Sequence, residues 1–83
     1  MKSKEFYEII KEKVLDNLNT IKNYADYCKK VYEYKDFSVF FSSLLPKQLF
    51  GVTNLCDYME KYDLNGDNII AYTKSILKSV NIL

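Results

Sequence analysis

The chain has 83 residues, 48% hydrophobic and 28% charged, and its 12 basic and 11 acidic residues leave a formal net charge of +1. This composition is typical of a folded protein, and the length predicts one domain over residues 1–83, without a strong attraction to nucleic acid or membrane. The sequence contains no histidine, tryptophan or arginine, so most common catalytic arrangements are excluded and we do not expect an enzyme.

Two features of the sequence predict a cytoplasmic protein with no membrane partner. Acidic residues such as Glu5 and Glu12 interrupt the N-terminal region, and the longest apolar cluster, residues 37–45, is far shorter than the ~20 residues that cross a bilayer. Cys28 and Cys56 show no paired spacing, which indicates reduced thiols rather than a disulfide or a zinc site.

The first predicted helix is long and runs from about residue 4 to about residue 34. Apolar residues recur there at every third or fourth position, as they do on one face of a helix. They are Phe6, Ile9, Ile10, Val14, Leu18, Ile21, Ala25, Cys28 and Tyr32. The polar run at residues 17–20 is a weak point, and the sequence leaves open whether the helix is continuous there.

Three shorter helices are predicted after it. The first covers residues 37–45 and ends at Pro46, because proline disfavours helical geometry in the residue before it and suits the start of a new helix. The next runs from Pro46 to Tyr62, and its inner face consists of Leu49, Val52, Leu55, Cys56, Met59 and Tyr62. The last begins at about Asn68. The expected fold is an all-α helical bundle, with one long N-terminal helix packed against three shorter helices.

The segment between the last two helices has the spacing of a metal-binding loop. Asp63, Asn65 and Asp67 stand at its first, third and fifth positions, and alternate oxygen-bearing side chains are what a hard cation such as calcium requires. Residues 63–74 therefore resemble an EF-hand loop, and the opening Asp-Leu-Asn-Gly-Asp is similar to the calcium loops of dockerin modules. The resemblance implies a weak calcium site formed by Asp63, Asn65, Asp67 and the backbone carbonyl of Ile69.

The loop also departs from the EF-hand pattern. Lys74 stands at position twelve, where the family places a bidentate acid, and Asn68 replaces glycine at position six. The alternative is that these residues form a turn and a helix cap, for which their composition is equally suited. The two readings differ in geometry, since an EF-type loop holds residues 69–71 extended, whereas a cap lets the last helix begin at about Asn68.

A stripe of tyrosines on the first helix is the second feature of interest. Tyr24, Tyr27, Val31 and Tyr34 follow helical spacing beside the main apolar stripe, so this part of the helix is apolar or aromatic nearly all round. Tyrosines at the edge of a core explain this pattern, and so does a protein interface, where tyrosine is enriched. The candidate partner-binding residues are Tyr24, Tyr27, Tyr32 and Tyr34, with Lys29 and Lys30 as a polar rim.

The sequence favours a small protein-protein interaction module that binds another protein or forms a homodimer. Such a regulator, inhibitor or immunity-type protein is similar in size and helical content to the helical-bundle bacteriocin immunity proteins and to small phage-encoded inhibitors. The first alternative is the weak calcium-binding module. The second is a DNA-binding regulator, because residues 49–53 resemble the Gly-Val-Thr turn of some helix-turn-helix proteins, although Asp57 and Glu60 would then face the bases.

Overall fold

The computed structural model describes the backbone of residues 2–31 and 34–83, and the side chains of residues 4–31 and 37–83. Over these residues the fold consists of α-helices joined by short connections, with no strand. The helices are α1 (Lys2–Asp16), α2 (Leu18–Val31), α3 (Tyr34–Phe50), α4 (Val52–Lys61) and α5 (Gly66–Ser79). The predicted all-α class is therefore confirmed.

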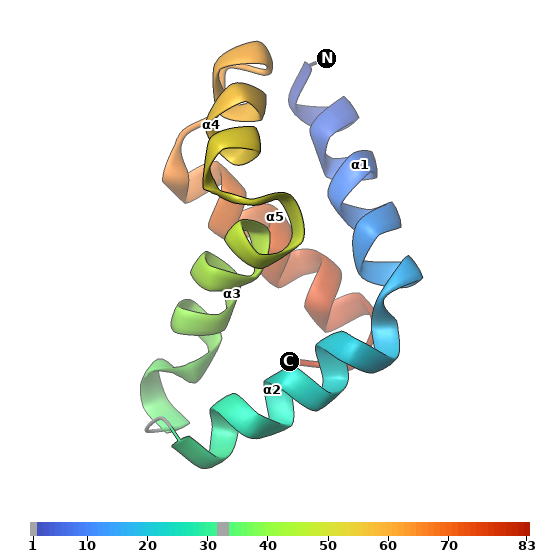
Figure 1. The fold of residues 1–83 in the computed structure, drawn as a ribbon, viewed down its shortest axis with the longest axis vertical. Coiled ribbons are helices and arrows are strands. Elements are labelled where there is room, and N and C mark those ends of the chain that lie inside the picture. Colours follow the sequence, from blue (N-terminus) through green and yellow to red (C-terminus); the bar gives the residue numbers. More distant parts are fainter. Residues whose placement is uncertain (1, 32–33) are drawn as a thin grey trace.

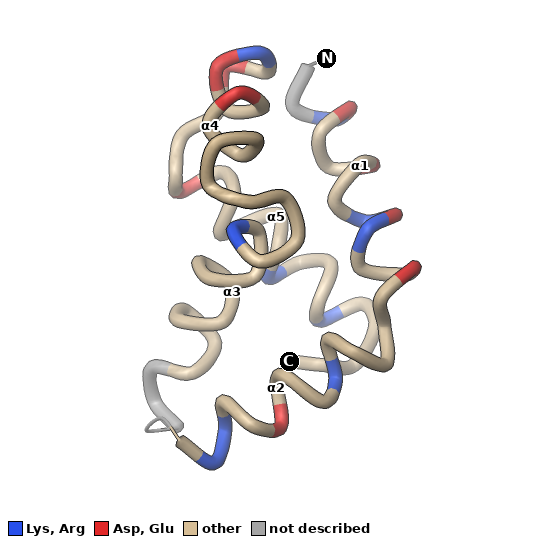
Figure 2. Tube along the Cα trace, viewed as in Figure 1, with Lys and Arg blue, Asp and Glu red and all other residues tan. Residues whose placement is uncertain are grey.

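Helix α3 lies at the centre of the arrangement. It packs against α5, α4 and α2, while α1 packs against α5 and α2 (Figure 1). Charged positions follow α1, α2 and α4, whereas between Phe37 and Phe50 the single charged residue of α3 is Lys47 (Figure 2). So little charge in this stretch suits a helix that other helices surround.

The long first helix of the prediction is divided at Asn17. The side-chain Nδ2 of Asn17 donates to the carbonyl of Lys13 at 2.8 Å, while its backbone N–H donates to Val14 at 3.2 Å instead of to Lys13. Asparagine competes in this way with the helical backbone bond, and the chain turns before α2 begins at Leu18. The one long N-terminal helix of the expected bundle is therefore not matched, and the helix is interrupted within the polar run 17–20, where the sequence left its continuity open.

The predicted helix end at Pro46 was also wrong, because α3 continues through it to Phe50. Proline inside a helix costs about 3 kcal/mol, since it cannot donate to the carbonyl four residues earlier. Pro46 is fully buried and Leu45 and Phe50 are buried beside it, so core packing offsets this cost. The buried Ser42 hydroxyl satisfies its hydrogen bond within the helix, donating to the carbonyl of Ser38 at 2.6 Å.

Gly51 forms the sharp joint between α3 and α4. Its backbone has φ 79° and ψ 154°, a conformation that side-chain-bearing residues rarely adopt. Its N–H still donates to Lys47 at 2.9 Å, and its carbonyl accepts from Leu55 at 3.0 Å, so both backbone polar groups of Gly51 are paired. Glycine at this position therefore allows α4 to begin in a new direction after a single residue.

The core contains most of the apolar stripes that the sequence predicts. Its buried apolar residues come from all the helices and from the connection and tail at the C-terminal end: Phe6, Ile10, Val14, Ile21, Ala25, Cys28, Phe37, Phe41, Leu45, Phe50, Leu55, Tyr62, Leu64, Ile69, Ile76, Leu77 and Ile82. The predicted inner face of residues 46–62 is only partly correct. Leu55 and Tyr62 are buried, but Cys56 is exposed and Val52 retains 63% of its accessible surface, because Gly51 rotates α4 relative to α3.

Candidate functional site

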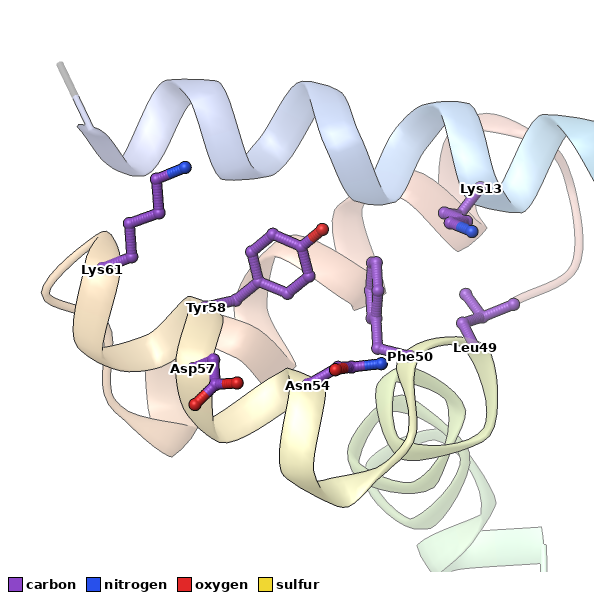
Figure 3. A pocket seen from close by; sticks show the side chains of 7 residues that line it. All are labelled: Lys13, Leu49, Phe50, Asn54, Asp57, Tyr58 and Lys61. Carbon is purple, nitrogen blue, oxygen red and sulfur yellow. The ribbon is translucent and has the colours of Figure 1, made fainter.

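The main candidate site is a hollow between α1 and α4. It has a volume of about 340 Å³ and is lined by Lys13, Leu49, Phe50, Asn54, Asp57, Tyr58 and Lys61. Figure 3 shows α1 along one side and α4 along the other, with the side chains of Phe50, Tyr58 and Lys61 directed toward α1. The hollow thus has an aromatic base and polar edges.

The aromatic base is fixed by ring packing within the core. The Phe50 and Tyr58 rings lie edge to face with centroids 5.3 Å apart, and Phe6 of α1 lies 5.9 Å from Phe50 and 5.8 Å from Tyr58. Aromatic pairs at these separations attract one another beyond the effect of area burial. The base is therefore held by three helices and is not free to collapse into the hollow.

The polar edges carry two lysines. The Nζ of Lys13 lies 5.9 Å from the Phe50 ring centroid, and the Nζ of Lys61 lies 5.3 Å from that of Tyr62. Both distances permit a cation–π attraction. Among the described residues, neither ammonium group has a carboxylate within ion-pair distance. Both charges therefore remain open to an anionic group from outside.

A second hollow continues the first along the bend between α1 and α2. Its volume is about 350 Å³, and it shares Lys13 and Leu49 with the first hollow. The other residues that line it are Asn17, Thr20, Ile21, Tyr24, Leu45 and Gln48. We call the two hollows together the long groove. It is apolar along its base and polar along its edges, so it is suited to binding an amphipathic segment.

The predicted tyrosine stripe divides into a packed part and an exposed part. Tyr24 is half-buried, and its ring lies 5.6 Å from that of Phe41, as expected for the edge of a core. Tyr27 and Val31, one helical turn apart on α2, remain 61% and 54% exposed. We call these two residues the α2 patch.

The other predicted partner-binding residues are two lysines and two further tyrosines. Lys30 is exposed one helical turn from Tyr27, whereas Lys29 is exposed on the opposite side of α2 from the patch, where its Nζ lies 5.3 Å from the Phe37 ring centroid. Tyr32 and the side chain of Tyr34 lie outside the described residues.

The long groove and the α2 patch belong to one continuous face. Thr20 and Tyr24 line the groove, and Tyr27 and Val31 follow them at helical spacing on α2. The sequence reasoning found the end of this face on α2 but missed Lys13, Phe50, Tyr58 and Lys61. These residues come together only through tertiary packing, and no local pattern relates α1 to α4.

The predicted calcium loop has the geometry of two helix ends. Asp63 has φ 54°, its N–H donates to Glu60 at 3.3 Å, and the N–H of Leu64 donates to Met59 at 2.8 Å. This is a Schellman motif that ends α4. Asn65 then caps α5, which begins at Gly66.

The cap also determines the positions of the other predicted ligands. Asp67 and Ile69 lie inside α5, and the Ile69 carbonyl accepts a hydrogen bond from the buried Thr73 hydroxyl at 2.7 Å. Residues 69–71 are helical rather than extended, which is the geometry of the turn-and-cap reading. Across the described residues, no three or more His, Cys, Asp or Glu side chains are grouped as they would be around a metal ion. The calcium site stays a prediction.

The helix-turn-helix resemblance falls on the α3–α4 joint. Gly51 alone connects these helices, and α4 exposes both Asp57 and Glu60. Two exposed acids on the helix that would read the bases oppose binding to phosphates. Within the described ranges, no helix is both long and apolar enough to cross a membrane.

Comparison with known proteins gives no match: neither a protein-family model, nor a curated protein sequence, nor a solved structure resembles this chain significantly. The class that the structure defines is a small all-α bundle with an open groove on one face.

Proposed function

We propose that this chain is a small protein-binding module that acts by occupying the surface of another protein, as regulators, inhibitors and immunity-type proteins do. The observation that carries the proposal is the α2 patch. Tyr27 and Val31 are large apolar side chains, neighbours on one helix face, and each leaves more than half of its surface in water. Burying such a side chain completely is worth about 1.5–3 kcal/mol, so a partner that covers both would gain a substantial binding energy.

The surroundings of the α2 patch support a protein partner over a nucleic acid. Exposed Lys30 lies one helical turn from Tyr27 beside the patch, and exposed Asp26 lies one turn before Lys30, which gives the mixed polar rim common around protein interfaces. The net charge of +1 and the absence of arginine offer little attraction to phosphates. A homodimer is the simplest form of this proposal, and a different protein is the other.

The proposal includes a cytoplasmic location. Cys28 is a buried free thiol and Cys56 an exposed one, and both are compatible with a reducing compartment.

Photo-crosslinking tests this function directly. The photoreactive analogue p-benzoylphenylalanine replaces Tyr27 in one sample and Glu12, an exposed residue of α1, in the control. The experiment is run in cells that naturally make the protein and also on the purified protein. We expect a crosslinked product from position 27 and none from position 12, and mass spectrometry then identifies the product as a homodimer or as a complex with another protein. Absence of any product specific to position 27 would contradict the proposal.

A further inference from the structure

We infer that the long groove receives an acidic amphipathic helix of the partner protein, with apolar side chains on the groove base and carboxylates at Lys13 and Lys61. This inference rests on the proposed function and names the chemistry of the partner. It follows from the shape of the groove, the composition of its base and the distribution of its charge.

The shape favours an elongated occupant. The two hollows are about 340 and 350 Å³ and share Lys13 and Leu49, so together they form an open trough that runs from α4, past Lys13 and the end of α3, to α2. A helix lying in a groove is a common way to fill such a trough. A helix of about 16 residues is about 24 Å long, shorter than the 36 Å long axis of the molecule.

The base of the groove selects apolar side chains. Leu49 where the hollows meet, Tyr58 in the first and Tyr24 in the second are half-buried and supply the accessible apolar surface. Phe50, Ile21 and Leu45 also line the hollows but are buried in the core. An amphipathic helix presents apolar residues at positions i, i+3 or i+4, and i+7, so successive turns would meet successive parts of this base. Asn17, Thr20 and Gln48 at the edges are neutral and add hydrogen-bonding groups without repelling an acid.

The charge of the groove selects carboxylates. Lys13 lies at the junction of the hollows and Lys61 lines the first, whereas Asp57 is the single acidic residue that lines either. Each lysine ammonium is held over a ring and has no carboxylate in ion-pair contact among the described residues. Acidic groups on the partner would therefore gain new ion pairs without breaking existing ones.

Peptide display on the folded, immobilised protein tests this inference. The probe is a library of random peptides about 16 residues long, a length that forms about four helical turns. We expect selected peptides to be rich in Asp and Glu and to carry apolar residues at helical spacing. A synthetic copy of the best peptide should gain helical circular dichroism on binding.

Charge reversal in the groove provides the decisive comparison. We expect Lys13→Glu and Lys61→Glu each to weaken binding of the selected peptide about tenfold, measured by fluorescence polarisation. Lys78→Glu, on the exposed side of α5, changes the net charge equally and should leave the affinity within about twofold. Replacing the matching acid of the peptide by lysine should restore binding to the reversed groove.

Several results would overturn the inference. They are a selection that enriches no peptide, enriched peptides without acidic bias, binding without gain of helix, and equal effects of Lys78→Glu and Lys13→Glu. If crosslinking at position 27 persists unchanged in the Lys13→Glu, Lys61→Glu double variant, the proposed binding function is supported. The inference of an acidic helix in the long groove is then wrong.

Discussion

Asn65 and Asn68 cap each other: the Asn65 side-chain oxygen accepts the backbone N–H of Asn68 at 2.9 Å, and the Asn68 side-chain oxygen accepts that of Asn65 at 3.0 Å. This reciprocal pair is a capping box, and it satisfies two N–H groups that the start of α5 would otherwise leave unpaired. Since Asp63 and Leu64 complete the end of α4 just before it, the whole segment between the helices is accounted for by helix ends.

The cap should contribute measurably to stability. We expect Asn65→Ala to lower the free energy of unfolding by about 1 kcal/mol, because the side-chain acceptor for the Asn68 N–H is lost. Urea unfolding followed by circular dichroism measures this change. Asn65→Asp is the matched control, since aspartate caps helices equally well and should keep most of the stability. An equal loss in both variants would show that the cap is not the cause.

The left-handed residue at the end of α4 leads to a stabilising substitution. Asp63 has φ 54°, a conformation that costs a residue with a side chain more than it costs glycine. We therefore expect Asp63→Gly to raise the free energy of unfolding by roughly 0.5 kcal/mol, after allowance for the greater flexibility of glycine in the unfolded chain. The same urea titration applies, and a clear loss of stability would mean that the Asp63 carboxylate makes a contribution the backbone geometry does not reveal.

Calcium should leave the stability of the protein unchanged. The Asn65 and Asn68 side chains are engaged in the cap, and the Ile69 carbonyl already accepts from Thr73, so these oxygens are not directed toward a common ion. A ligand that binds only the folded state raises the thermal midpoint. We expect equal midpoints in millimolar calcium and in chelator. A rise with calcium that disappears in Asp63→Gly would instead support the EF-hand-like site.

The two glycines should respond in opposite directions to the same substitution. Gly51 has φ 79° and ψ 154°, and an added Cβ would meet no atom within 4 Å, so the cost of Gly51→Ala comes from the backbone alone and should be roughly 1–3 kcal/mol. Gly66 begins α5, also with open space around it, and its φ lies outside the positive region. Gly66→Ala should stabilise by about 0.5–1 kcal/mol. Unfolding midpoints of the two variants should therefore fall on opposite sides of the wild type.

Local sequence patterns were sufficient to predict that the chain is helical and which residues form most of the core. Helical spacing correctly identified buried residues such as Phe6, Val14 and Ile76, because each stripe reports one face of one helix. The predicted helix ends were less accurate wherever tertiary packing competed with the local preference of the sequence. Burial of Pro46 outweighed its tendency to end a helix, and the conformation of Gly51 turned Val52 outward.

The long groove could not be derived from the sequence. Its lysines lie 48 positions apart as Lys13 and Lys61, and its base joins Phe50 and Tyr58 across the Gly51 joint. Their proximity depends on the placement of α4 beside α1 after the Gly51 joint, which follows from packing rather than from any periodic pattern. The α2 patch was accessible to sequence reasoning because it is a single stripe, but the burial of Tyr24 against Phe41 was not.

The α2 patch leads to the last prediction, which separates binding from folding. The double variant Tyr27→Ser, Val31→Ser should abolish the crosslinked or co-purifying complex, because both large apolar side chains of the patch are removed. It should change the free energy of unfolding by no more than about 0.5 kcal/mol, since exposed residues contribute little to stability. Leu15→Ser, Val39→Ser is the matched control, because these residues are 48% and 52% exposed on α1 and α3, outside the patch. Calorimetric titration of the partner into each double variant measures the two affinities. An equal loss of affinity in both variants would show that general surface hydrophobicity, rather than the α2 patch, drives association.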